Sequence, residues 1–253
     1  MSGSLEGKTI VVTGAAGGLG GAAARLFAEA GARLVLGDLN AAGLRDLERE
    51  LDDAVVKAVA GDLSRERDAR TLIAAAPERL DGLFNVVGIS GRSLGDGPAH
   101  ACELAGWERV LAVNLTSAFL CCKHAVPRMQ EGGGGSIVNL GSVLGLGGHP
   151  LFATHAYAAS KGGLIVLTRA MAATYARDGI RCNVLCPGLV RTPMSSRAQT
   201  NSEIQAALPD LQPLTGDLLS PKAIAEAALF LLSEASAALT GVVLPVDAGW
   251  TLR

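Results

Sequence analysis

The chain has 253 residues, of which 49% are hydrophobic, and a formal net charge of −2. This near-neutral balance gives no electrostatic reason to expect binding to nucleic acid or to an anionic membrane, so we expect neither partner. No apolar run approaches the ~18–20 residues that span a bilayer, and residues 1–6 lack the basic and apolar regions of a signal peptide.

Short runs of β-branched residues alternate along the chain with longer segments rich in Ala and Leu. The runs predict seven strands, at residues 9–12, 34–36, 55–59, 82–87, 136–140, 181–185 and 242–246. The segments predict helices at residues 22–30, 44–51, 67–76, 107–129, 157–177 and 223–232. Apolar strands that alternate with helices indicate a parallel sheet covered on both faces. We expect an α/β fold: a single doubly wound domain over residues 1–253, with a seven-stranded, mostly parallel sheet.

A long polar stretch between Pro187 and Pro221 interrupts this alternation. Connections of this length commonly serve as functional lids. We expect an extended, mobile connection at about residues 188–220 that covers the carboxyl ends of the strands, and with them the substrate.

The first predicted strand runs directly into a glycine-rich turn. Glycines there allow a tight turn and let a pyrophosphate approach the backbone, while the next helix offers its N-terminal amides to the anion. The spacing is Gly14-x-x-x-Gly18-x-Gly20, which differs from the common GxGxxG pattern. In this strand–turn–helix context the turn predicts a dinucleotide site formed by Gly14, Gly17, Gly18, Leu19 and Gly20.

Asp38 ends the second predicted strand, where a carboxylate can accept hydrogen bonds from the ribose hydroxyls of the adenosine half. The same charge would repel a 2′-phosphate, and the neighbours Leu39 and Asn40 carry no positive charge to offset it. We therefore expect NAD rather than NADP. Asp62 and Leu63, at the end of the third strand, are placed to meet the adenine; alternatively, Asp62 is the N-cap of the next helix.

Tyr157 and Lys161 lie four positions apart in a predicted helix, and so on one face of it. A phenol is a poor base because its pKa is normally near ~10, and an ammonium one turn away favours the phenolate. The pair predicts a proton-transfer device, with an ordinary exposed Tyr–Lys pair as the alternative.

The chain resembles the short-chain dehydrogenase/reductase family over about residues 8–251. The matching positions are Thr13, Gly14, Gly18, Gly20, Asp62, the run Asn85-Val86-Val87-Gly88, Asn114, Ser142, Tyr157, Lys161, Asn183 and the pair Pro187-Gly188. Their order and spacing are specific in combination, although no single element is. The resemblance implies a Rossmann fold and exchange of a hydride between NAD and a secondary alcohol or ketone.

The resemblance also implies a role for each catalytic residue. Tyr157 would be the general acid/base, Lys161 would lower its pKa and hold the nicotinamide ribose, and Ser142 would hydrogen-bond the substrate oxygen. Asn114 would hold a water that links Lys161 to solvent; a structural hydrogen bond of this buried Asn is the alternative. This chemistry requires no metal.

Further cofactor contacts implied by the resemblance are Asn85, Gly88, Pro187, Gly188, Val190 and Thr192, in addition to Tyr157 and Lys161. Two features depart from the family pattern. The chain has Asn85-Val86-Val87-Gly88 where Asn-Asn-Ala-Gly is usual, and 15 positions separate Ser142 from Tyr157, slightly more than is common. The extra length should fall in a loop that carries His149 and His155, which we expect to be exposed rather than catalytic.

The expected substrate wall is small to medium in size and mostly apolar. Its residues are Ser142, Leu144, Phe152, Tyr157, Gly188 and Met194. Arg92 and Arg197 flank it, and we expect them to be solvated surface residues rather than contacts for an acidic substrate. The sequence predicts a secondary alcohol or ketone without identifying it.

Three functions are compatible with these residues. The first is an NAD-dependent oxidoreductase that interconverts a secondary alcohol and a ketone, and the complete set of Asn114, Ser142, Tyr157 and Lys161 favours it. The second is an NADPH-linked 3-oxoacyl-carrier-protein reductase, which Asp38 argues against. The third is a non-catalytic NAD-sensing protein, which would need no tyrosine base.

The five cysteines form no C-x-x-C pair and no group at zinc spacing. We expect reduced thiols and a cytoplasmic protein. The resemblance implies a homotetramer that associates through the predicted helices at residues 107–129 and 157–177 and through the C-terminal strand.

Overall fold

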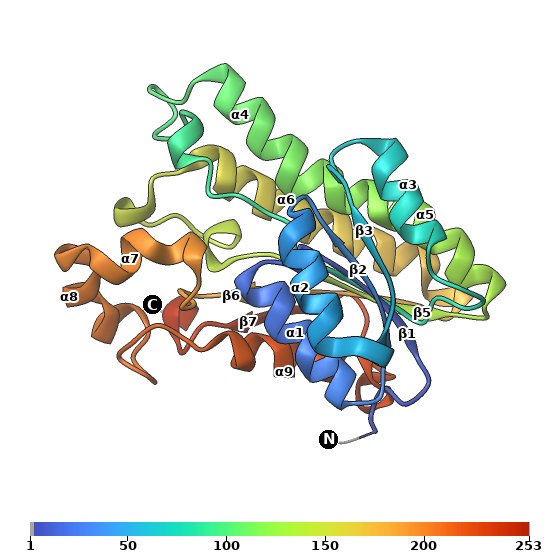
Figure 1. Ribbon diagram of the computed structural model, residues 1–253. Coiled ribbons are helices and arrows are strands. Elements are labelled where there is room, and N and C mark those ends of the chain that lie inside the picture. The colour runs from blue at the N-terminus through green and yellow to red at the C-terminus, as the bar shows by residue number, and fades with distance from the viewer. Residues whose placement is uncertain (1–2, 253) are drawn as a thin grey trace.

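The computed structural model describes residues 3–252, so residues 1, 2 and 253 of the predicted domain lie outside it. Seven strands form one sheet in the order β3-β2-β1-β4-β5-β6-β7, and every pair of neighbours is parallel (Figure 1). The strands are β1 (Thr9–Thr13), β2 (Arg33–Asp38), β3 (Val55–Ala60), β4 (Gly82–Asn85), β5 (Gly135–Leu140), β6 (Ile180–Pro187) and β7 (Val243–Val246). The predicted doubly wound α/β fold is confirmed.

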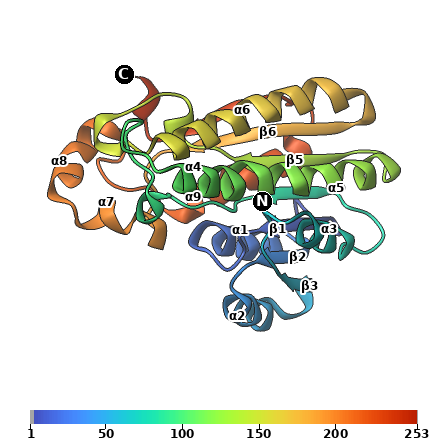
Figure 2. The same cartoon turned by 90° about the horizontal axis from the view of Figure 1, so that it is seen from above.

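Helices cover both faces of this sheet, as Figure 2 shows from above. One face carries α1 (Gly18–Glu29), α2 (Ala41–Leu51) and α9 (Pro221–Leu232), and the other carries α3 (Glu66–Ala74), α5 (Ser117–Glu131) and α6 (His155–Tyr175). Successive strand residues face opposite sides: in β1, Ile10 and Val12 pack in one apolar core and Val11 in the other. Because both faces are buried, the strands are apolar throughout.

The predicted helix at residues 107–129 is longer than expected and irregular at its centre. It comprises α4 (Leu104–Leu111), a π-helical turn (Ala112–Thr116) and α5. By length and composition Leu104–Glu131 could cross a membrane, although we expected no such segment from the sequence. However, 56% of its most apolar stretch is buried within the fold. Core helices of globular proteins pass the same test, so this helix is weak evidence for a membrane span.

The segment at residues 188–220 is not the extended connection that its composition suggested. It contains α7 (Ser196–Thr200) and α8 (Ser202–Leu211), which project beyond the carboxyl end of β6 in Figure 1. The side chain of Asn201 caps α8 by accepting the amide of Ile204 at 3.0 Å. Ile204, Leu208 and Leu218 form a separate small apolar core, against which Phe152 packs. Most polar residues of the segment are exposed, although Gln212 is buried, so its composition did not reveal that it is folded.

Candidate active site

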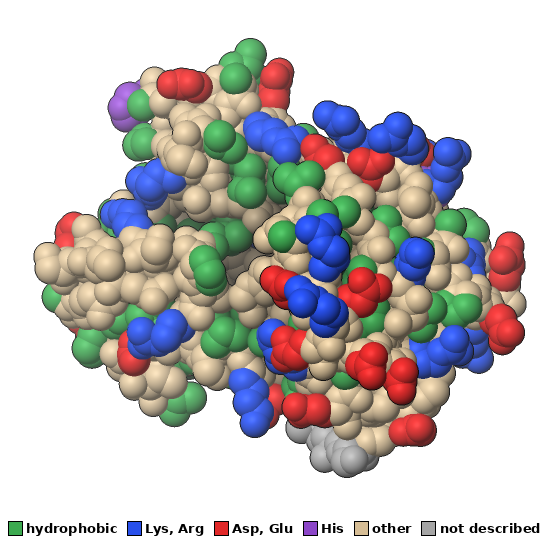
Figure 3. All heavy atoms as spheres, in the orientation of Figure 1, with side chains coloured by type: hydrophobic (Ala, Val, Ile, Leu, Met, Phe, Trp, Pro, Cys, Tyr) green, Lys and Arg blue, Asp and Glu red, His purple; other side chains and the backbone are tan. Residues whose placement is uncertain are grey.

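A cavity of about 630 Å³ opens at the carboxyl ends of the strands, where the strand order reverses between β1 and β4. Figure 3 shows its hollow between the α7–α8 segment and the rest of the molecule. Ligands of open α/β sheets bind at such a switch point. Every site residue predicted from the sequence lines this cavity except Asn85 and Asn114.

The glycine-rich turn is built for close approach of an anion. Gly14 has φ +66°, and a Cβ placed on Gly20 would lie 2.1 Å from the Gly14 carbonyl oxygen, so only glycine fits at position 20. The amide of Gly17 donates to that carbonyl at 3.0 Å, and α1 then begins at Gly18 with no side-chain cap. The first amides of α1 therefore remain available to a pyrophosphate, and the turn fits a dinucleotide.

The carboxylate of Asp38 is held in place by the backbone. Its Oδ2 accepts the amide of Ala16 at 3.0 Å, and its Oδ1 accepts the amide of Asn40 at 2.8 Å. Asp38 and the exposed Leu39 line the cavity beside the glycine-rich turn. This fixed negative charge suits the hydroxyls of an adenosine ribose.

Asp62 also lines this end of the cavity, and its carboxylate accepts the amide and the hydroxyl of Ser64 at 3.1 and 2.6 Å. The alternative role as a helix N-cap is not observed, because Arg65 is the N-cap of α3. Burial raises the pKa of Asp62, but the hydrogen bonds from Ser64 and the charge of Arg109, 3.4 Å away, outweigh it and leave the pKa lowered. Asp62 is therefore ionised at neutral pH.

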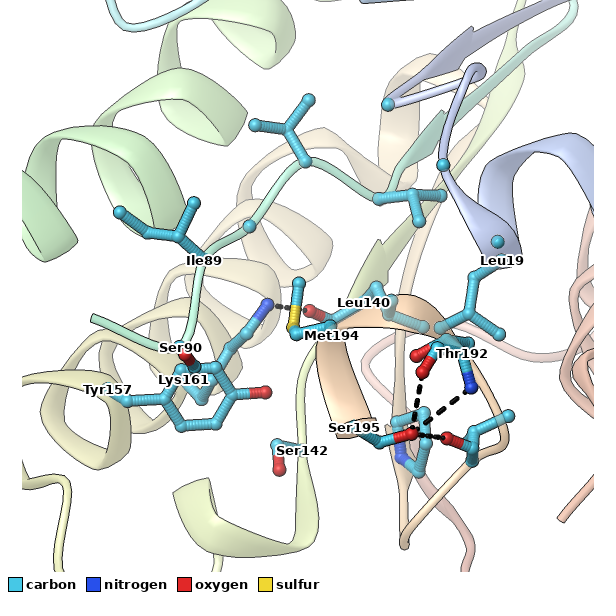
Figure 4. A pocket seen from close by; sticks show the side chains of 18 of the residues that line it. Leu19, Ile89, Ser90, Leu140, Ser142, Tyr157, Lys161, Thr192, Met194 and Ser195 are labelled. Carbon is cyan, nitrogen blue, oxygen red and sulfur yellow. Dashed lines mark hydrogen bonds between the residues drawn. The ribbon is translucent and has the colours of Figure 1, made fainter. Parts of the chain in front are cut away.

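Tyr157 and Lys161 point into the cavity from the first turns of α6 (Figure 4). Lys161 is 3% exposed; its Nζ donates to the carbonyl of Leu140 at 2.6 Å and lies 5.8 Å from the centre of the Tyr157 ring. Ser142 follows β5 and lies on the same side of the cavity in Figure 4. Tyr157 and Lys161 are therefore not an ordinary exposed pair. They lie in one cavity with Ser142, as predicted.

The electrostatics of the pair differ from the expectation. Burial raises the pKa of Tyr157, an interaction with the Ser142 hydroxyl opposes this, and the net pKa is raised. Burial also lowers the pKa of Lys161 to about 8. The expected lowering of the Tyr157 pKa by Lys161 is absent from the protein alone, because both groups are desolvated and the ammonium is turned toward Leu140.

Asn114 lies in the π-helical turn and is fully buried outside the cavity lining. Its Oδ1 accepts the amide of Ile89 at 2.8 Å, and its Nδ2 donates to the Ile89 carbonyl at 3.0 Å and to the Ser160 hydroxyl at 3.1 Å. Ser160 in turn donates to the Tyr157 carbonyl at 2.7 Å. The side chain of Asn114 therefore makes structural hydrogen bonds, which was the alternative to holding a water. These bonds connect it to the turn of α6 that carries Tyr157.

The side chain of Asn85 does not make the cofactor contact that we expected. Asn85 is 4% exposed and donates to the Oδ1 of Asn139 at 2.8 Å within the core, so its side chain does not reach the cavity. The neighbouring Val86, Val87 and Gly88 line the cavity instead. Residue type could not reveal this, because side-chain direction at the end of a strand depends on the strand register.

Asp96 was missed from the sequence. It is 5% exposed, and its two carboxylate oxygens accept the amides of Ala156 and Tyr157 at 2.9 Å each. Gly91 and Gly95, with φ +72° and +86°, shape the loop that brings it there. It satisfies the free donors at the start of α6 and fixes the backbone of Tyr157. No spacing rule links positions 60 residues apart, so only the fold could reveal this contact.

An aromatic cluster closes the substrate end. The ring of Trp250 lies 5.5 Å from that of Phe152 and 5.7 Å from that of His149, measured between centroids. His149 is half-buried in this cluster, so the expectation of an exposed histidine was wrong for His149 and right for His155. Trp250 joins the predicted wall from the C-terminal end of the chain.

The five cysteines are free thiols, and four of them are buried. Burial raises the pKa of Cys186, on β6, to about 11, and its side chain does not line the cavity. Within residues 3–252, no three or more His, Cys, Asp or Glu side chains are grouped so that they could hold a metal ion.

The fold, with a glycine-rich turn and a fixed carboxylate in the cavity at its switch point, is that of a dinucleotide-binding protein. The family model described as enoyl-(acyl carrier protein) reductase matches residues 14–251. Cis-4-hydroxycyclohexanecarboxylate dehydrogenase of Sinomonas cyclohexanicum and 2-(S)-hydroxypropyl-CoM dehydrogenase 3 of Xanthobacter autotrophicus are each 39% identical to the chain, over 99% of both proteins. An oxidoreductase of the short-chain dehydrogenase/reductase family from Burkholderia thailandensis is 35% identical, with a TM-score of 0.87 over 97% of this chain and 93% of that chain.

The chain belongs to the short-chain dehydrogenase/reductase family. The relatives from Sinomonas cyclohexanicum and Xanthobacter autotrophicus are named as dehydrogenases of hydroxy compounds, and dehydrogenases of this family use NAD or NADP. The resemblance seen in the sequence is therefore confirmed.

Proposed function

We propose that the protein is an NAD-dependent dehydrogenase that interconverts a secondary alcohol and a ketone, with Tyr157 as general acid/base. The observation that carries the proposal is the convergence of Tyr157, Ser142 and Lys161 in the same cavity as the glycine-rich turn and Asp38. A non-catalytic NAD sensor would need the turn and the carboxylate but not a buried phenol beside a hydroxyl and an ammonium.

When bound, the nicotinamide would accept the hydride from the carbinol carbon. Tyr157 would take the hydroxyl proton as the carbon–oxygen double bond forms, and return it in the reverse direction. Ser142 would hydrogen-bond the same oxygen and hold it beside the phenol. The nicotinamide end would rest against the Pro187, Gly188, Val190 and Thr192 segment, which lines the cavity.

Lys161 would act in this scheme by holding the nicotinamide ribose. Its Nζ has one acceptor, Leu140, and a Cβ placed on Gly88 would lie 3.5 Å from it, so the glycine keeps the space beside the ammonium open. Since burial raises the pKa of Tyr157 in the protein alone, we expect the phenolate to gain stability only once the cofactor is bound.

NAD is favoured over NADP by the surroundings of Asp38. Its carboxylate is fixed by two backbone amides, and Arg109, the arginine that lines this end of the cavity, pairs with Asp62. Among the described residues that line this end of the cavity, a 2′-phosphate would meet the fixed carboxylate of Asp38 and no guanidinium free of a carboxylate partner. The same argument stands against an NADPH-linked 3-oxoacyl-carrier-protein reductase, although the matching family model is described as a reductase.

The test is a screen for NAD reduction across cyclic and open-chain secondary alcohols, since the similar dehydrogenases are named for a ring alcohol and an open-chain alcohol. NAD and NADP are titrated in parallel by protein fluorescence. We expect turnover with NAD, and we expect Asp38→Ser to narrow the preference for NAD by roughly tenfold. Tighter binding of NADP than of NAD by the unaltered protein would refute the cofactor assignment.

We propose further that the protein is a cytoplasmic homotetramer. Phe119 on α5 and Val166 on α6 are 45% and 67% exposed, and such apolar residues on both association helices suit a subunit interface. The five free thiols suit a reducing compartment. Light scattering at micromolar concentration tests the assembly, where a monomeric mass would refute it, and cell fractionation tests the location.

A further inference from the structure

Of the arginines in the part of the chain that the structure describes, three line the cavity, and they differ in their partners. The guanidinium of Arg109 lies 3.4 Å from Asp62. Within the described residues 3–252, neither Arg92 nor Arg197 has a carboxylate within ion-pair distance. Arg191, close to Arg197 in sequence, pairs with Asp217 at 2.8 Å. The two unpaired guanidiniums are therefore a local feature of the cavity.

Arg92 and Arg197 come from segments far apart in the sequence, and both line the cavity. Arg92 begins the short turn that follows β4, and Arg197 lies on α7. Arg197 donates to the carbonyl of Leu151 at 3.2 Å, which holds it beside the loop that carries Phe152. Figure 3 shows basic side chains at the left of the hollow, where the segment before α4 faces α7.

The two charges affect one another. Burial lowers the pKa of Arg92, and the positive charge of Arg197 lowers it further, while Asp96 opposes the shift. The oxygens of Asp96 already accept two backbone amides, so this carboxylate is committed elsewhere. Two guanidiniums that act on one another in this way repel, and an anion bound beside both would relieve the repulsion.

The charges that line the cavity differ from one end to the other, and they favour an anion at the end that carries Arg92 and Arg197. Asp38 and Asp62 line the end beyond β2 and β3 and would repel a negative group there. The wall near Arg92 and Arg197 is apolar, with Leu144, Phe152, Met194 and Trp250. An apolar wall beside two guanidiniums fits a molecule with a hydrocarbon body and a single carboxylate.

We propose that Arg92 and Arg197 form a carboxylate subsite, so that the preferred substrate is a secondary alcohol that carries a carboxylate on a hydrocarbon body. This inference rests on the proposed function, since it places the carbinol group at Tyr157. Both arginines are exposed, as the sequence led us to expect, and the proposal adds a binding role to their exposed guanidiniums.

The first experiment compares the oxidation of 4-hydroxycyclohexanecarboxylate with that of its carboxamide, which has a similar shape and no charge. The proteins are the unaltered enzyme, Arg92→Gln, Arg197→Gln and the double variant. The ratio of kcat/KM for acid over amide should exceed one in the unaltered enzyme and fall by roughly tenfold with each substitution. The matched control is Arg70→Gln, which removes an exposed arginine of α3 outside the cavity and should leave the ratio unchanged.

A second experiment separates failure of this subsite from failure of the proposed function. Cyclohexanecarboxylate has no hydroxyl to oxidise, so its binding, followed by thermal shift, reports on the subsite alone. Binding to the unaltered enzyme and loss in the double variant would support the subsite even if no alcohol were oxidised. If alcohols are oxidised but the acid-to-amide ratio does not exceed one, or the double variant retains it, the subsite is refuted and the dehydrogenase stands. If cyclohexanecarboxylate does not bind and no alcohol is oxidised, both proposals fail.

Discussion

Removing the carboxylate of Asp96 should weaken the fold and the catalytic step together. Asp96→Ala removes the acceptors of the Ala156 and Tyr157 amides, each of which lies 2.9 Å from a carboxylate oxygen. Asp96 itself is 5% exposed. A hydrogen bond to a charged group contributes about 1.5–3 kcal/mol. Allowing for water that enters the space left by the side chain, we expect a loss of about 2–4 kcal/mol in the free energy of unfolding.

The catalytic effect follows from the place of the lost bonds. One of the two amides belongs to Tyr157 itself, so the phenol is released from its position beside Ser142. Misplacement of a reacting group by about 1 Å can reduce a rate by roughly 100-fold. We expect kcat to fall by about 10- to 100-fold while the affinity for NAD changes little, and Asp96→Asn, which keeps one acceptor oxygen, to recover part of the loss.

The assay measures urea unfolding, NAD affinity, and kcat across pH for each variant. Because the interaction with Ser142 lowers the pKa of Tyr157, a displaced phenol should move the rise of kcat for alcohol oxidation to higher pH. Asp81→Ala is the matched control. Asp81 accepts the amide of Thr9 at 2.9 Å where β1 begins, at the end of the sheet away from the cavity, so its loss should lower stability and leave kcat intact. An Asp96→Ala variant that loses stability but keeps the unaltered kcat and pH profile would show that Asp96 only supports the fold.

Three further outcomes test the site. Tyr157→Phe should bind NAD nearly as the unaltered protein does and lose almost all turnover; retained turnover would exclude the tyrosine base. The pKa of Lys161 is about 8 in the folded protein and ~10.4 in the unfolded chain. Burying its charged form therefore destabilises the fold fully below about pH 8, and this destabilisation decreases as the pH rises toward ~10.4. Lys161→Met should therefore be up to about 3 kcal/mol more stable than the parent near pH 7, with the gap in urea titrations closing by about pH 10; a gap independent of pH would contradict this. Gly20→Ala would place a Cβ 2.1 Å from the Gly14 carbonyl oxygen and should sharply weaken NAD binding in a fluorescence titration, whereas Gly147→Ala, which meets nothing within 4 Å, should not.

The loop at residues 91–97 connects two of these tests. Asp96 fixes the backbone of Tyr157, the proposed general acid/base, and Arg92, four residues earlier, lines the same cavity. If both proposals hold, substitutions in this loop should alter substrate preference and the catalytic step separately. Measuring the acid-to-amide ratio in the Asp96 variants would show whether the two ends of the loop act independently.

The sequence by itself determined the fold class and most of the cavity lining. Apolar strands alternating with helices leave few solutions other than a parallel sheet, and the residues after each strand must then meet at one edge. The glycine-rich turn, Asp38, Ser142, Tyr157 and Lys161 were found because their chemistry depends on local spacing or on strand ends. The similarity of the chain to named dehydrogenases agrees with that reading.

Only the tertiary structure decided what depends on side-chain direction and on contacts between distant segments. It turned Asn85 into the core and gave Asn114 the carbonyl and amide of Ile89 as partners. It brought Asp96 to the start of α6, and it brought Arg92 and Arg197 to the lining of one cavity. The physical reason is that burial and pairing belong to the three-dimensional neighbourhood of a residue: whether an arginine meets a carboxylate, and whether it lines a cavity, depends on segments far from it in the sequence.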